Sequence, residues 1–160
     1  MAIKEGDTLP DVKVTEMVDG KPTQISLPEL TKGKRAVLFA VPGAFTPTCH
    51  AKHLPGFVEQ AQAIRGKGVS DIFCLAVNDA FVMDAWGKAG NAGGKVRMLA
   101  DGNGTLTKAL GLEMDGSQFG LGQRSQRYAM IIRDGKVEAL LKEPGPGLSA
   151  SSAEAVLQKL

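Results

Sequence analysis

The sequence predicts an α/β fold in which helices flank both faces of a central mixed β-sheet. Two continuous apolar runs, residues 36–41 and 71–77, are typical of parallel strands that are covered on both faces. A stretch with helical character follows each run, and strands that alternate with helices build layered folds of this class. Later in the chain, Asp134-Gly135 separates two further apolar runs, which indicates a β-hairpin.

In the first half of the chain, residues 1–33 look irregular apart from two short strand candidates. The elements expected there, in order, are strands at 12–14, 24–27 and 36–41, a helix at 48–65, a strand at 71–77 and a helix at 80–89. Pro55 lacks a backbone N–H and should kink the long helix or split it in two. Asn78-Asp79 can cap the helix that follows it.

The second half should add a third strand of the alternation, the hairpin and a last helix. The elements expected there, in order, are a strand at 96–100, a short helix at 105–110, hairpin strands at 128–132 and 137–141, and a helix at 153–159. Asp101-Gly102 marks a turn, and Gly111 can end the short helix because glycine readily adopts the left-handed conformation of a C-cap. A serine-rich stretch can cap the last helix.

Length and composition fit a single domain spanning residues 1–160. Of the 160 residues, 43% are hydrophobic, which is enough for a core, and 22% are charged, close to the norm for globular domains. A net charge of +2 gives no bulk electrostatic reason to expect nucleic acid or a membrane as a partner. No apolar run approaches the length of a membrane span.

The N-terminal residues Met1–Asp7 lack the apolar core of a signal peptide, which favours a cytoplasmic location. A transit peptide that has been removed is the alternative. Two cysteines are too few for a disulfide framework, and in a reducing compartment they indicate redox or catalytic use.

The stretch from Pro42 to Cys49 carries the strongest functional signal. It joins the first long apolar strand to a helix, so Cys49 lies at or near a helix N-terminus. Unpaired backbone N–H groups and the helix dipole favour negative charge there, and therefore favour the reactive thiolate. A buried, inert cysteine is the alternative. The polar and turn-forming neighbours Thr46, Pro47 and His50 argue against it.

The order of elements, with a reactive cysteine at the first strand-to-helix junction, matches a thioredoxin-like fold. A disulfide oxidoreductase would carry Cys-x-x-Cys at this junction, whereas this chain reads Thr46-Pro47-Thr48-Cys49. Because the hydroxyl of Thr46 replaces the first sulfur, no local disulfide can close. We therefore expect one cysteine to attack another electrophile.

Three segments resemble the peroxiredoxin family. Residues 41–49 contain its active-site pattern Pro-x-x-x-Thr-x-x-Cys, and residues 53–57, His-Leu-Pro-Gly-Phe, are similar to type II, or fifth-subfamily, members. Residues 77–86 and 125–129 also resemble that subfamily. The likeness covers nearly the whole chain. It implies a thiol-dependent peroxidase that reduces hydrogen peroxide and organic hydroperoxides without a cofactor.

The resemblance implies a role for four residues. Cys49 would be the peroxidatic nucleophile and would become a sulfenic acid. Thr46 would hold the peroxide, Arg127 would favour the thiolate and stabilise charge on the leaving oxygen, and Pro42 would shield the sulfur. Without the resemblance, the favoured interpretation of Arg127 is a surface residue. Thr46 could be a helix N-cap, which is compatible with its proposed role, and Pro42 could be a turn residue.

Cys74, in the middle of the strand at 71–77, is a candidate resolving cysteine. A small side chain buried in the core is the favoured interpretation. Some type II peroxiredoxins carry a cysteine at this spacing, so a disulfide with Cys49 is the alternative, and it would need local unwinding. The late resolving cysteine of some animal relatives is absent. We expect an external thiol to reduce the sulfenic acid, with glutathione and glutaredoxin as the first choice and thioredoxin as the second.

Histidine and phenylalanine residues near the site suggest further contacts. Cys49 and His53 share a helix face and could bind zinc, but too few ligands accompany them, and we expect no metal. His50 and His53 are instead expected to be polar neighbours of the site that could touch a partner subunit. Phe45 and Phe119 could edge its mouth. Related proteins dimerise through loops around this cysteine, so the resemblance implies a homodimer.

Two other functions stay open on the sequence alone. Cys49 could serve a redox sensor or chaperone switch that reacts once rather than turning over. A disulfide reductase or isomerase is the other, and the absence of cysteine at position 46 argues against it.

Overall fold

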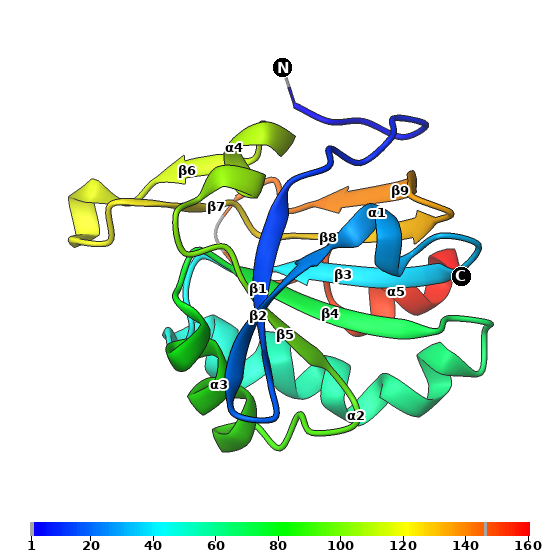
Figure 1. Cartoon of the computed structure of the whole chain (residues 1–160), viewed down its shortest axis with the longest axis horizontal. Coiled ribbons are helices and arrows are strands. Elements are labelled where there is room, and N and C mark those ends of the chain that lie inside the picture. Colours follow the sequence, from blue (N-terminus) through cyan, green and yellow to red (C-terminus); the bar gives the residue numbers. More distant parts are fainter. Residues whose placement is uncertain (1, 146) are drawn as a thin grey trace.

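Seven strands of the chain form one mixed sheet (Figure 1). The computed structural model describes residues 2–145 and 147–160. The strands of this sheet are β1 (Lys13–Val18), β2 (Lys21–Ser26), β3 (Arg35–Ala40), β4 (Asp71–Ala76), β5 (Arg97–Ala100), β8 (Tyr128–Arg133) and β9 (Lys136–Lys142). Their order in space is β2-β1-β5-β4-β3-β8-β9, with β3, β4 and β5 parallel and the other pairs antiparallel.

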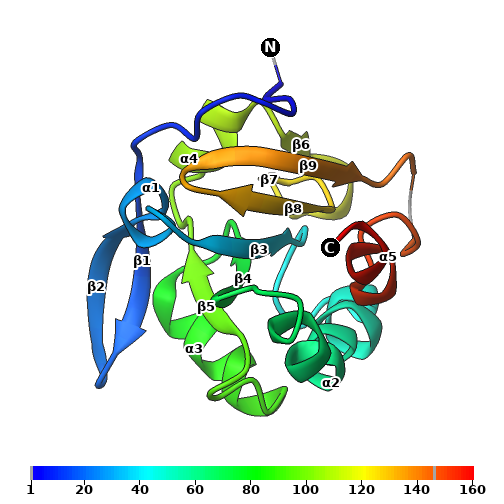
Figure 2. The ribbon, with the colours of Figure 1, turned by 90° about the vertical axis from the view of Figure 1, so that its right-hand side faces the viewer.

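Helices cover both faces of this sheet, as the sequence predicts (Figure 2). One face packs against α2 (Leu54–Arg65), α3 (Ala80–Ala89) and α5 (Ala153–Lys159), and the other against α1 (Leu27–Leu30) and α4 (Thr105–Leu110). Side chains of β3 alternate between the two faces: Val37 and Phe39 enter the first core, and Leu38 and Ala40 the second. No helix among the described residues is both long and apolar enough to cross a bilayer.

The N-terminal part of the chain is more regular than predicted. Residues 1–33 contain the β1–β2 hairpin, which turns at Asp19 and Gly20 with φ of 51° and 78°. The short helix α1 follows it directly. The predicted strands at 12–14 and 24–27 overlap β1 and β2, but both strands are longer than predicted, and α1 was not predicted.

A second small sheet was also missed by the sequence analysis. It pairs β6 (Glu113–Asp115) with β7 (Gln123–Ser125), and the 3₁₀-helix η2 (Ser117–Phe119) connects the two strands. Figure 1 shows this segment extending away from the main sheet.

The long predicted helix is present and is split, as Pro55 predicts. Its first part contains the π-helix η1 (Cys49–His53), in which the Leu54 N–H donates to the Cys49 carbonyl, five residues earlier. In an α-helix the proline ring would clash with the carbonyl four residues before it. The wider turn ends just before Pro55, and the regular helix α2 continues from there.

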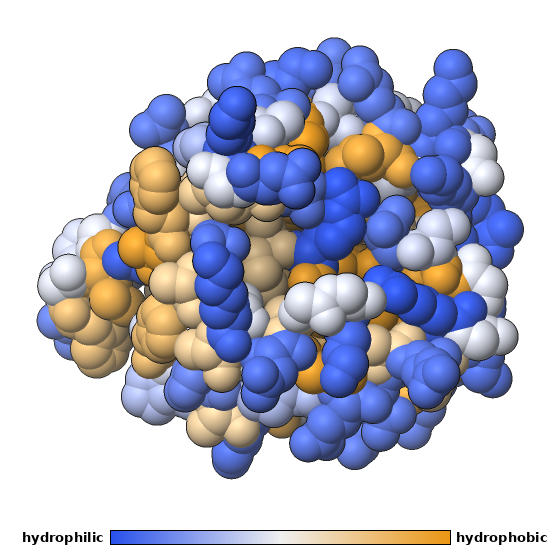
Figure 3. All heavy atoms as spheres, turned by 60° about the horizontal axis from the view of Figure 1, so that its bottom comes forward, coloured by the Kyte–Doolittle hydropathy of each residue, from blue (hydrophilic) through white to orange (hydrophobic). Residues whose placement is uncertain are grey.

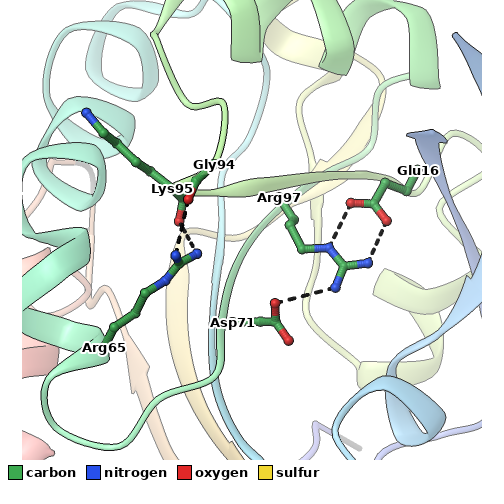
Figure 4. Close-up of polar contacts among 6 residues, drawn as sticks. All are labelled: Glu16, Arg65, Asp71, Gly94, Lys95 and Arg97. Carbon is green, nitrogen blue, oxygen red and sulfur yellow. Dashed lines mark hydrogen bonds and ion pairs between the residues drawn. The ribbon is translucent and has the colours of Figure 1, made fainter. Parts of the chain in front are cut away.

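Two arginines fix β5 and the loop that precedes it (Figure 4). Arg97 on β5 donates to both carboxylate oxygens of Glu16 on β1, at 2.9 and 2.7 Å, and to Asp71 on β4 at 3.5 Å. Arg65, at the end of α2, donates to the carbonyls of Gly94 and Lys95 at 3.1 and 3.2 Å. These contacts fix β5 beside the parallel strands that position the candidate site.

Candidate active site

The pairing of β3 with β8 explains why a distant arginine meets Cys49. Ala40, at the carboxyl end of β3, pairs with Tyr128, at the start of β8. Arg127, which precedes Tyr128, therefore lies beside the carboxyl end of β3, where the chain continues into the loop and helix that carry Cys49. Because alternate residues of a strand face the same side, Arg127 faces the side of Ala129, where α2 and Cys49 pack.

One nitrogen of the Arg127 guanidinium donates a hydrogen bond to the sulfur of Cys49, and another contacts His53. Arg127 Nη2 donates to Cys49 Sγ at 3.0 Å, and Arg127 Nη1 lies 2.9 Å from Nδ1 of His53. The π-helical turn keeps Cys49 and His53 on one face, so a single planar side chain contacts both. The structure thus brings together the cysteine and the arginine that the resemblance pairs.

His53 is held as a neutral imidazole with a defined tautomer. Its ring is buried against Phe39 and Phe57, and its Nε2 lies 2.9 Å from the carbonyl oxygen of Ser151. An arginine can only donate and a carbonyl can only accept, so Nδ1 accepts and Nε2 carries the proton. Burial lowers the pKa of His53 to about 4, and the charge of Arg127 adds to this effect.

Thr46 and Pro42 lie in the loop that precedes Cys49. The Thr46 hydroxyl donates to the Gly43 carbonyl at 2.7 Å, and its own carbonyl accepts from His50 N in the first helical turn. The Pro42 carbonyl faces Nη1 of Arg124 at 3.4 Å. Thr46 is thus fixed one turn before Cys49, and both loop residues are half-buried.

Phe45 has the left-handed backbone conformation, with φ of 63°, and its ring is exposed. The neighbouring Ala44 N–H donates to the Asn78 side chain at 2.9 Å, which ties the loop to the end of β4. A non-glycine residue at such an angle is uncommon and is kept there only by its surroundings.

Cys74 lies on β4 opposite Phe39 and is fully buried on the same face of the sheet as Cys49. Both cysteines are free thiols. Burial raises the pKa of the Cys74 thiol well above its ordinary range, and the nearby Cys49 raises it further. Cys74 is therefore a protonated core side chain in this arrangement.

The two histidines behave differently from each other. His50 is exposed and accepts a hydrogen bond from the indole N–H of Trp86 at 3.1 Å. His53 is 1% exposed and uses both ring nitrogens, one toward Arg127 and one toward Ser151. With both nitrogens engaged, the arrangement opposes zinc binding by Cys49 and His53.

Sequence reasoning missed three residues that support this cluster. Arg124 reaches the Pro42 carbonyl, Ser151 supplies the acceptor for His53, and Glu143 binds Ser151. The local sequence holds no signal for these contacts, because Arg124 and Ser151 meet partners far away in the sequence, and Glu143 binds a turn eight residues later.

Comparison with known proteins identifies the family of this chain. The sequence profile of the Redoxin family matches residues 4–157. Peroxiredoxin-2C of Oryza sativa subsp. japonica is 50% identical over 157 residues, which cover 97% of this chain and 96% of that protein. The chloroplastic Peroxiredoxin-2E-2 of the same plant is 51% identical over 163 residues, covering 99% of this chain and 72% of the relative.

Solved structures give the same result. The crystal structure of reduced Prx3 from Vibrio vulnificus in complex with H₂O₂ is 49% identical to this chain, with a TM-score of 0.94 and coverage of 98% of each chain. The predicted thioredoxin-like fold is thereby confirmed. The chain belongs to the peroxiredoxins, thiol peroxidases of the thioredoxin-like superfamily.

Proposed function

We propose that the Cys49 thiolate attacks one oxygen of a hydroperoxide. The S–O bond forms as the O–O bond breaks, Cys49 becomes a sulfenic acid, and the other oxygen takes a proton and leaves as water or an alcohol. The observation that carries this proposal is the 3.0 Å contact from Arg127 Nη2 to Cys49 Sγ. A guanidinium stays charged and only donates, so it favours both the thiolate and the charge that develops on the leaving oxygen.

Thr46 and Pro42 are proposed to shape the space for the peroxide. Because the Thr46 hydroxyl gives its proton to the Gly43 carbonyl, it can only accept a hydrogen bond from an incoming peroxide O–H. Pro42 brings no backbone N–H to the site, and its ring would exclude bulk water beside the sulfur.

Access to the sulfur requires a small movement in this proposal. Cys49 is 0% exposed, so a water-sized molecule cannot touch it in the arrangement described. Displacement of the 42–46 loop or of the Arg127 side chain would open a path. The loop residues Pro42 and Thr46 are already half-buried at the surface.

The direct test compares two cysteine variants. Cys49→Ser should abolish peroxide consumption, and Cys74→Ala, the matched control, should keep it, in a multiple-turnover assay with excess glutathione and glutaredoxin. Substantial turnover by Cys49→Ser would refute the proposal. A single reaction per wild-type chain would instead favour a redox sensor.

We propose that an external thiol reduces the sulfenic acid, with glutathione and glutaredoxin as the first choice and thioredoxin as the second. Support comes from Cys74, whose thiol is protonated and buried at the centre of β4, where it cannot act as a resolving nucleophile without local unwinding. Intact-mass spectrometry after one equivalent of peroxide, with and without glutathione, would distinguish an internal disulfide from a mixed disulfide.

A homodimer is also proposed. Phe45, Phe81 and Phe119 are 48%, 67% and 78% exposed, and Figure 3 shows apolar surface on the projecting segment and on the body beside it. Exposed apolar surface around a site is typical of an interface. Sedimentation equilibrium should give twice the chain mass of 16.8 kDa, and a monomer would contradict the proposal.

Two further expectations stay predictions. We propose that residues 1–160 act as one domain, which limited proteolysis would test by the absence of a stable smaller fragment. A cytoplasmic location would be tested by fractionation of the source cells.

A further inference from the structure

The carboxylate of Glu143 accepts hydrogen bonds from one turn of the chain, at residues 149–151. Oε2 accepts from Ser151 N and Ser151 Oγ, both at 2.7 Å, and from Ser149 N at 3.0 Å, and Oε1 accepts from Ser149 Oγ at 3.1 Å. Burial alone would raise the pKa of Glu143, but these hydrogen bonds lower it to about 2. The carboxylate is therefore ionised at neutral pH, and its hydrogen bonds fix the turn at residues 149–151.

Ser151 links Glu143 to His53 through hydrogen bonds. Ser151 is fully buried, and while its N–H and hydroxyl bind Glu143, its carbonyl accepts from Nε2 of His53 at 2.9 Å. Three polar groups of one residue are thus fixed at once. The position of the carbonyl follows from the position of the Glu143 carboxylate.

The Ser151 carbonyl in turn selects the tautomer of His53. With the proton on Nε2, Nδ1 can accept from Arg127 Nη1 at 2.9 Å. With the proton on Nδ1, two N–H donors would face each other and the guanidinium would be pushed off the ring. The same guanidinium donates to Cys49 Sγ, so its displacement would weaken the contact with the sulfur.

Glu143 also contacts the backbone of Arg127. The backbone N–H of Glu143 donates to the carbonyl oxygen of Arg127 at 3.1 Å. Hydrogen bonds therefore form a closed ring through Arg127, His53, Ser151 and Glu143. One residue is linked to both the backbone and the guanidinium of the arginine.

We propose that Glu143 is a positioning residue, which acts through Ser151 and His53 to hold the guanidinium of Arg127 against the sulfur of Cys49. This inference rests on the proposed function, because it matters for the rate only if Arg127 assists peroxide attack at Cys49.

The first experiment measures the second-order rate constant for oxidation of Cys49 by hydrogen peroxide. Glu143→Gln puts an amide N–H among the serine donors and should lower the rate by about 10- to 100-fold, because a displaced reacting group costs rates of this order. Glu154→Gln removes the same charge from an exposed position on α5 and should stay within about twofold of wild type.

A double-mutant cycle separates positioning from general support of the fold. His53→Leu removes both hydrogen bonds of the relay and fills the buried site with a side chain of similar size. If Glu143 acts through His53, Glu143→Gln should cost less than about threefold in the His53→Leu background. If the fold-losses in rate of the two single variants multiply in the double variant, the two residues act independently and the proposal is overturned.

Nitrogen-15 NMR of the imidazole gives a readout that does not depend on a variant folding. Wild-type His53 should show a protonated Nε2 and an unprotonated Nδ1, and Glu143→Gln should show a mixture of tautomers. A wild-type ring protonated on Nδ1 would overturn the inference.

The outcomes also separate this inference from the proposed function. A rate for Glu143→Gln within about twofold of wild type overturns the inference alone, provided that Cys49→Ser consumes no peroxide in the multiple-turnover assay described above. An active Cys49→Ser overturns both.

Discussion

The hydroxyl of Thr46 shows how one hydrogen bond sets what a side chain can offer. Its proton goes to the Gly43 carbonyl at 2.7 Å, so only its lone pairs face a peroxide. Thr46→Val should lower the rate of peroxide consumption by about 100-fold, the order found when one polar group that aligns a reacting oxygen is removed.

Thr46→Ser is the matched control, because it keeps the hydroxyl and loses only a methyl group. It should stay within about tenfold of wild type. Equal rates for the valine and serine variants would mean that Thr46 acts only as a loop residue. Both variants should be compared by steady-state peroxide consumption at the same thiol concentration.

The predictability of single residues depends on how local their contacts are. Cys49 could be predicted from eight consecutive residues, because the strand-to-helix junction itself creates its environment, whereas the role of Thr46 rests on the family resemblance. Arg127 needed a family resemblance, since nothing around it in the sequence points to a site. Glu143 carries no signal at all, because its partners are turn residues whose position only the folded chain defines.

At the level of helices and strands, local rules predicted the buried elements and found the more exposed ones only in part or not at all. The Asp79 side chain caps α3 by accepting from Val82 N at 2.8 Å, and Asp134-Gly135 forms the predicted hairpin turn. Asp19-Gly20 makes a similar turn, but the sequence predicted β1 and β2 only in part, at residues 12–14 and 24–27. Neither strand contains an apolar run, and β2 is largely exposed, so the pattern could not show their full length.

The packing of α3 against β5 gives a prediction at this scale. A Cβ added to Gly87 would lie 2.7 Å from Met98 Cγ, closer than atoms pack. Alanine is a better helix former by about 1 kcal/mol, but overpacking costs about 1–3 kcal/mol. Gly87→Ala should therefore lower the free energy of unfolding by about 1 kcal/mol, as measured by urea titration.

Gly66→Ala provides the comparison at the end of α2. Gly66 is exposed, has a right-handed φ of −62°, and has no neighbour closer than 3.4 Å to an added Cβ. This variant should be neutral or gain up to about 1 kcal/mol. A Gly87→Ala protein as stable as Gly66→Ala would contradict the close approach of α3 to β5.

On the scale of the whole molecule, the sheet gathers the site from four distant parts of the chain. The end of β3 leads to Cys49, the start of β8 brings Arg127, the end of β9 brings Glu143, and the segment before α5 brings Ser151. His53 lies at the centre of these contacts and is buried without charge. The site and the acid stability of the fold are therefore linked through one imidazole.

The stability of the protein should fall as the pH decreases from about 6.5 toward 4. Burial lowers the pKa of His53 from 6.5 to about 4, so in this window the unfolded chain binds a proton that the folded chain refuses. Stability thus rises with pH and is complete above about 6.5, with up to about 3 kcal/mol at stake. Glu143 contributes a separate loss, because its lowered pKa stabilises the fold above 4.5 and this gain disappears toward about 2.

His53→Gln should flatten the upper part of this decline, because an amide does not titrate. Urea unfolding midpoints at about pH 7 and about pH 5 measure the difference. If His53→Gln loses as much stability between these two conditions as wild type, another group causes the acid sensitivity. A wild-type midpoint that does not change would mean that the His53 ring accepts a proton in the folded state, and the acceptor contact of Nδ1 with Arg127 would then have to break.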